Sequence, residues 1–182
     1  MAMSDFDFTK ALLEKFFSSK ILQRKFDDIF EYKITDWEKW WQIELALYMA
    51  RNDEIADNWG IEEPFYTDLR KQKRKNTIRV DLCFRRKGFN SKKFICLELK
   101  QNKDYKVCIR NMIKDAEKVF SAHKRSHNGA EVRELFVVGI YPSRSKKEVH
   151  DFIESEIDRS KIEIKNRWTK FIPGCNFSIS MF

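Results

Sequence analysis

The chain has little glycine or proline, with five and three residues respectively among 182. This scarcity argues against a collagen-like repeat, a low-complexity segment or a disordered tail. No apolar run approaches the ~20 residues that span a bilayer, and the N-terminus has Asp5 and Asp7 where a signal peptide would be basic. The sequence therefore predicts a soluble cytoplasmic protein. The length of the chain suits a single domain over residues 1–182.

Cysteine is also scarce, and none of the four cysteines (Cys83, Cys96, Cys108 and Cys175) belongs to a Cys-x-x-Cys pair. The spacing therefore disfavours a zinc site. Cys83 and Cys96 lie in apolar, strand-like runs, where a free cysteine behaves as a small hydrophobic residue. We expect buried, reduced thiols.

Basic side chains exceed acidic ones by 36 to 28, and the net charge is +8. The excess is concentrated in residues 70–75 and 85–87. Basic segments of this kind attract phosphate-bearing partners, although a charge of this size is also compatible with an ordinary solvated surface. The candidate nucleic-acid contacts in these segments are Lys71, Lys73, Arg74, Lys75, Arg85 and Arg86.

Apolar periodicity predicts the helices. Residues 6–30 read as two short helices with a break near Ser18-Ser19, and a third helix begins with Thr35 or Asp36 as its N-cap and runs to about Arg51. Further amphipathic helices are predicted for residues 107–123 and 145–157.

Strands are predicted where apolar residues alternate with polar ones or form short continuous runs. The expected ranges are 63–69, 77–84, 93–100, 135–141 and a short edge strand at 161–164. The order from residue 36 is therefore helix, three strands, helix, strand.

The candidate chemistry lies on two neighbouring predicted strands. Glu98 and Lys100 are two residues apart and share one face of their strand, and Asp81 can join them from the strand before. Two carboxylates and the backbone carbonyl of Leu99 would give the hard oxygen ligands that Mg²⁺ or Mn²⁺ takes. The ordinary alternative is a cross-strand salt-bridge cluster, which carries a desolvation penalty.

A divalent ion in such a site would polarise a scissile phosphate and lower the pKa of a bound water. Lys100 would orient the water or help to deprotonate it, and would counter the charge that develops on the phosphate. This layout suits the cleavage of phosphodiester bonds.

The half-motifs Arg79-Val80-Asp81 and Glu98-Leu99-Lys100 resemble those of the PD-(D/E)XK nuclease superfamily, although Val80 stands where that family usually has proline. The resemblance implies an α/β, restriction endonuclease-like αβββαβ core over residues 36–165. That core is a mixed central sheet flanked by helices, preceded here by an N-terminal helical extension over residues 1–34.

The resemblance also implies auxiliary residues. Many members place a glutamate on the helix before the first strand, and Glu44 is the matching position, with Glu38 the runner-up. The helix after the lysine often supplies polar residues, here Gln101, Arg110 and Lys114.

The sequence thus predicts a Mg²⁺-dependent endonuclease with Asp81, Glu98, Lys100 and Glu44 as catalytic residues. DNA is the expected substrate, and a homodimer is possible in this family. The alternative is a catalytically silent nuclease-like fold that binds nucleic acid or protein through its basic surface.

Two other groups have ordinary explanations as well as functional ones. His123 and His127 have the i, i+4 spacing of a metal pair, but their polar neighbours favour a solvated helix end. Trp37, Trp40 and Trp41 could stack on bases, but their helical spacing favours the core.

Overall fold

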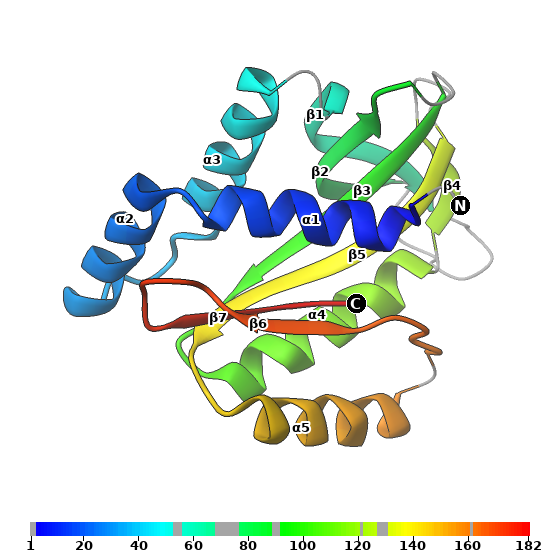
Figure 1. The fold of residues 1–182 in the computed structure, drawn as a ribbon. Coiled ribbons are helices and arrows are strands. Elements are labelled where there is room, and N and C mark those ends of the chain that lie inside the picture. Colours follow the sequence, from blue (N-terminus) through cyan, green and yellow to red (C-terminus); the bar gives the residue numbers. More distant parts are fainter. Residues whose placement is uncertain are drawn as a thin grey trace.

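The computed structural model describes residues 3–52, 56–67, 77–88, 92–120, 122–126, 131–160 and 162–182. These ranges contain five helices and seven strands, and the fold is α/β (Figure 1). In chain order they are α1 (Asp5–Phe17), α2 (Lys20–Glu31), α3 (Glu38–Arg51), β1 (Ala56–Thr67), β2 (Thr77–Arg86), β3 (Lys93–Gln101), α4 (Tyr105–Phe120), β4 (Ala122–Ser126), β5 (Glu131–Pro142), α5 (Lys146–Arg159), β6 (Trp168–Phe171) and β7 (Phe177–Met181).

The strands form one mixed sheet in the order β3-β2-β1-β4-β5-β7-β6, in which β3 also pairs with β5. The β3–β5 pair is parallel, and the other pairs are antiparallel. A parallel pair needs a crossover between its strands, and α4 lies in that connection. The mixed sheet predicted with the core is therefore present.

Helices cover the sheet on both sides, and β5 illustrates how its residues are divided between the two cores. Val138 and Ile140 belong to the larger core, which the helices α1, α2 and α3 complete. Val137 and Tyr141 belong to a second core with α4 and α5. This alternation follows from the two-residue period of a strand, and it explains why β5 reads as one continuous apolar run.

The N-terminal helices match the sequence pattern closely. Ser19 is the N-cap of α2 and accepts a hydrogen bond from the Leu22 amide, so the helix break falls at Ser18-Ser19 as predicted. The predicted cap of α3 is wrong, because Trp37 occupies the N-cap without a side-chain bond. Asp36 instead adopts a left-handed backbone with φ of 59°.

The C-terminal part differs from the predicted pattern. Residues 162–164 form no strand, since Ile162 and Ile164 pack against the α4–α5 core instead of joining a ladder. β7 takes the place beside β5, and β6 pairs with β7. Alternation within a short segment does not predict which segment will pair with the edge of the sheet.

The end of α4 also differs from the prediction. The helix stops at Phe120, and His123 lies in β4, which pairs with β1 and β5. The predicted helix end at His123 is therefore wrong, and His127 lies outside the described residues. Among the described helices, none has the length and apolar character to cross a membrane.

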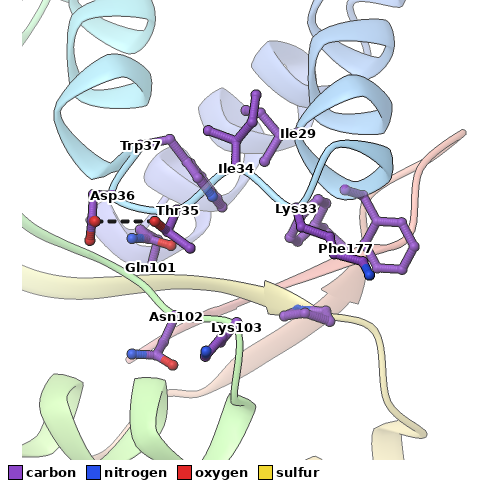
Figure 2. Close-up of a pocket in the computed structure, with 12 residues that line it drawn as sticks. Ile29, Lys33, Ile34, Thr35, Asp36, Trp37, Gln101, Asn102, Lys103 and Phe177 are labelled. Carbon is purple, nitrogen blue, oxygen red and sulfur yellow. Dashed lines mark hydrogen bonds between the residues drawn. The ribbon is translucent and has the colours of Figure 1, made fainter.

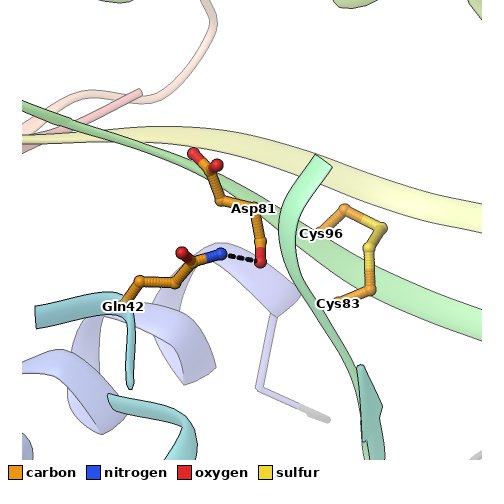
Figure 3. The surroundings of a disulfide bond; sticks show 4 residues. All are labelled: Gln42, Asp81, Cys83 and Cys96. Carbon is orange, nitrogen blue, oxygen red and sulfur yellow. Dashed lines mark hydrogen bonds between the residues drawn. A yellow bond between two sulfur atoms is a disulfide. The ribbon is translucent and has the colours of Figure 1, made fainter. Parts of the chain in front are cut away.

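The prediction of reduced thiols is wrong for one pair of cysteines. Cys83 and Cys96 stand opposite each other in the β2–β3 ladder, with Cα atoms 4.2 Å apart, and they form a disulfide (Figure 3). Cross-strand register brings them together, and register is not visible in cysteine spacing. Cys108 and Cys175 are free.

Candidate active site

The β2–β3 hairpin places the three predicted residues on one face. Since Cys83 and Cys96 are joined on that face, residues two or four positions away along each strand share it. Asp81 therefore lies beside Cys83, and Glu98 and Lys100 follow Cys96. The structure thus brings together the acids and the lysine that the sequence selects.

Asp81 lies where β2 and β3 separate. The ladder ends at the pair Leu82–Leu97, and the amide of Leu99, two residues further along β3, donates to Asp81 Oδ2 at 2.7 Å. Gln42 of α3 donates its side-chain amide to the Asp81 carbonyl (Figure 3). Burial raises the pKa of Asp81 above its ordinary value, while the Leu99 hydrogen bond and Lys100 act in the opposite direction.

Lys100 lies at the centre of the cluster. Its Nζ is 3.0 Å from Asp115, 3.5 Å from Glu98 and 3.6 Å from Glu38. The same ammonium donates to the Leu99 carbonyl at 2.9 Å. Burial alone would lower the pKa of Lys100, but the three carboxylates raise it above its ordinary value. Lys100 is therefore a fixed cation at neutral pH.

Glu98 is the most deeply buried acid of the cluster, with 5% of its surface exposed. Its Oε2 has no hydrogen-bond partner among the described residues. Burial first, and then the charge of Asp81, raise the pKa of Glu98 to about 7. A buried carboxylate oxygen without a partner is uncommon in folded proteins and suggests a ligand position.

Glu38 completes the cluster from the first turn of α3. Its Oε2 accepts a hydrogen bond from the Gln101 amide at 3.0 Å, and its Oε1 faces Lys100. Burial raises the pKa of Glu38 above its ordinary value, against the opposing effect of Lys100. The runner-up of the sequence analysis is thus the glutamate that reaches the site.

The structure does not bring Glu44 to the cluster. Glu44 pairs with Lys25 of α2 at 2.5 Å and accepts a bond from the Trp40 indole at 3.2 Å. It follows Glu38 by six residues, about 1.7 turns of helix, so the two side chains point in different directions.

Two residues of the site, Asp115 and Gln42, were not predicted from the sequence. Asp115 lies on the stripe of α4 that begins with the buried residues Cys108 and Met112, at spacings of four and three. An acidic residue on the otherwise apolar, buried face of a helix indicates a candidate functional residue, and the sequence shows this pattern. Gln42 is 2% exposed. In the sequence it is likewise a polar residue among the apolar residues of α3.

The helix after Lys100 contributes differently from the prediction. Gln101 is the last residue of β3 and does not belong to that helix, and its backbone amide donates to Glu38. Arg110 pairs with Glu156 at 3.3 Å and stacks on Phe152. Lys114 is exposed on α4. Of these three, Gln101 alone touches the cluster in a bond that the structure records among the described residues.

The basic segments give little support for a binding surface. Arg85 pairs with Asp57 at 2.5 Å, and Arg86 contacts the Met3 carbonyl at 2.9 Å and the Phe8 ring. Both arginines therefore have structural roles in the fold. The remaining predicted contacts, Lys71, Lys73, Arg74 and Lys75, lie outside the described residues.

The oxygen atoms of the cluster fit a hard divalent cation. In the described ranges, no three histidine, cysteine, aspartate or glutamate side chains stand in ready-made metal geometry. Asp81, Glu98 and the Leu99 carbonyl nevertheless supply only hard oxygen atoms, which suit Mg²⁺ or Mn²⁺. The unpartnered Oε2 of Glu98 is the observation that fits a cation here.

Comparison with known proteins returned no match, whether to a protein-family model, to a curated protein or to a solved structure. The case for a function therefore depends on the geometry of this site and on the half-motifs that carry the resemblance.

Proposed function

We propose that this protein is a metal-dependent endonuclease that hydrolyses phosphodiester bonds in DNA, with a restriction endonuclease-like catalytic core. One observation carries the proposal. Asp81, Glu98 and Lys100 converge where β2 and β3 separate, and the innermost acid, Glu98, has a carboxylate oxygen without a partner among the described residues.

Asp81, Glu98 and the Leu99 carbonyl would hold Mg²⁺ or Mn²⁺. When bound, the ion would supply a Lewis acid for the scissile phosphate and a water of lowered pKa. The protein positions these ligands in advance, because the Leu99 amide orients the Asp81 carboxylate and Gln42 holds the Asp81 carbonyl. Such preorganisation lowers the cost of assembling the site.

Lys100 would stabilise the charge that develops on the phosphate oxygens. Three carboxylates keep it protonated, so it acts as a cation and a hydrogen-bond donor, and it does not serve as a proton acceptor. The acids Glu38 and Asp115, both within 3.6 Å of Nζ, hold the ammonium in place. We assign the auxiliary acidic role to Glu38 in place of Glu44.

The experiment is cleavage of supercoiled plasmid DNA with Mg²⁺ or Mn²⁺. We expect Asp81→Asn and Lys100→Ala to reduce nicking at least 100-fold, since the first removes a ligand of the metal ion and the second removes the cation that stabilises charge on the phosphate. Glu38→Gln should reduce it less. Glu44→Gln is the matched control, because it changes a glutamate of the same helix outside the cluster, and should retain activity. Full activity in Asp81→Asn or Lys100→Ala would disprove the mechanism.

A second candidate is a catalytically silent nuclease-like fold that binds nucleic acid. The observation that favours it is the set of three carboxylates that already surround Lys100, as in a structural salt-bridge cluster. Such a module would bind DNA with a steep salt dependence and leave it intact with every divalent ion. Cleavage that requires both the metal and Asp81 would exclude it.

A further inference from the structure

A pocket of about 550 Å³ is lined by residues that adjoin members of the cluster along the chain (Figure 2). One wall is the loop between α2 and α3, which ends at Trp37, next to Glu38. The opposite wall begins at Gln101, the neighbour of Lys100, and continues through Asn102 and Lys103. Both walls therefore adjoin residues of the cluster along the chain, and the backbone amide of Gln101, a lining residue, donates to the Glu38 carboxylate of the cluster at 3.0 Å.

Aromatic rings form the apolar side of the pocket. Phe177 lies between two other lining rings, with its centroid 5.6 Å from Trp37 and 5.7 Å from Phe30 in edge-to-face contacts. Trp37 and Phe177 are buried, whereas Phe30 is 42% exposed. Phe30 therefore offers a ring to a ligand without being essential to the core.

Charged and amide groups form the other side. Lys33 and Lys103 line the pocket together with the side chains of Gln101 and Asn102. Lys33 ends α2 in a Schellman motif, in which the Ile34 amide donates to the Ile29 carbonyl at 3.0 Å, and this cap accounts for its φ of 53°.

We propose that this pocket receives one nucleobase of the substrate strand, unstacked from its neighbours, next to the phosphate at the cluster. The inference rests on the proposed function for the position of that phosphate. A base has a flat ring for the aromatic side and a hydrogen-bonding edge for the amides, and its flanking phosphates suit Lys33 and Lys103. The volume lies within the range of roughly 300 to 1,000 Å³ that small ligands occupy.

A base within a duplex cannot enter such a concave pocket, because it is stacked and paired. The substrate strand is therefore single or locally opened at the cluster. A purely apolar ligand fits less well, since it would leave the lining amides and ammonium groups without partners.

The test measures binding of a single-stranded DNA oligonucleotide in EDTA, without cleavage, by fluorescence anisotropy. A second oligonucleotide has the same backbone with abasic residues throughout. Phe30→Ala should weaken binding of the first oligonucleotide roughly 5- to 100-fold and leave that of the second unchanged. Phe171→Ala, in which a 48% exposed ring of β6 outside the pocket is removed, should alter neither.

Phe30→Leu guards against a folding defect, because it retains apolar bulk and loses only the ring; it should weaken binding of the base-containing strand selectively. Equal losses on both oligonucleotides, or no loss in either Phe30 variant, would overturn the inference. Since no metal is present, this result is independent of whether plasmid cleavage occurs. If plasmid DNA is cleaved but the Phe30 variants bind normally, the base-binding role of the pocket is wrong and the nuclease proposal stands. If the Phe30 variants lose binding selectively but plasmid DNA is not cleaved, the nuclease proposal is wrong and the pocket stands.

Discussion

Replacing Glu98 by Gln should change stability in a manner that depends on pH. Burial and the neighbouring Asp81 raise the pKa of Glu98 from its ordinary value of 4.5 to about 7. The folded protein therefore binds a proton at this carboxyl more tightly than the unfolded chain does. The resulting stabilisation is complete below about pH 4.5 and is lost as the pH rises through about 7.

The size of the effect follows from the pKa difference. One pKa unit corresponds to about 1.4 kcal/mol, so between about pH 5 and pH 8 this carboxyl should lower the wild-type free energy of unfolding by roughly 2 to 3 kcal/mol. Gln resembles the protonated acid and does not titrate. The free energy of unfolding of Glu98→Gln minus that of wild type should therefore be larger at about pH 8 than at about pH 5, by roughly 2 to 3 kcal/mol.

The assay is urea unfolding of both proteins at the two pH values in EDTA, so that no divalent ion contributes. Groups that titrate equally in both proteins cancel in the difference. Ser180→Ala is a neutral control, because it removes a buried hydroxyl that bonds Tyr141 at 2.6 Å and no carboxyl. Its effect should be the same at both pH values. An effect of Glu98→Gln that is also independent of pH would refute the reasoning.

Three further outcomes are expected. Gly139→Ala should lower the free energy of unfolding by about 1 to 3 kcal/mol in urea titrations, because its Cβ would overlap Met112 Sδ and press on Cys108 Sγ. A neutral result would mean that the Met112 side chain moves aside at no cost. Reduction of the Cys83–Cys96 disulfide should lower the free energy of unfolding by about 2 to 3 kcal/mol in the same assay, since it opens a closed loop with a sequence separation of 13. The stability of a Cys83→Ser/Cys96→Ser variant should not change with reductant. Mn²⁺ should raise the melting temperature of wild type and leave that of Asp81→Asn unchanged. At a free Mn²⁺ concentration about 100 times Kd, the stabilisation of the wild type should be about 2.7 kcal/mol. Equal shifts in both proteins would mean that the ion binds elsewhere.

The helices and strands that the sequence predicts most accurately are those whose residues have one strong local pattern. The break at Ser18-Ser19 and the strand at β5 are of this kind, because capping and continuous apolar runs are local features. β4, β6 and β7 were not predicted. The sheet positions of β4 and β7 depend on partners distant in the chain, and β6 joins the sheet through β7. Local propensity cannot identify those partners.

The sequence by itself determined that Asp81, Glu98 and Lys100 belong together, because strand alternation over one hairpin is sufficient to place them on a common face. Only the tertiary structure decided which other residues join them. The rotation of α3 selects Glu38 over Glu44, and the packing of α4 brings in Asp115. Helix rotation depends on packing against the sheet, and spacing along one chain does not contain that information.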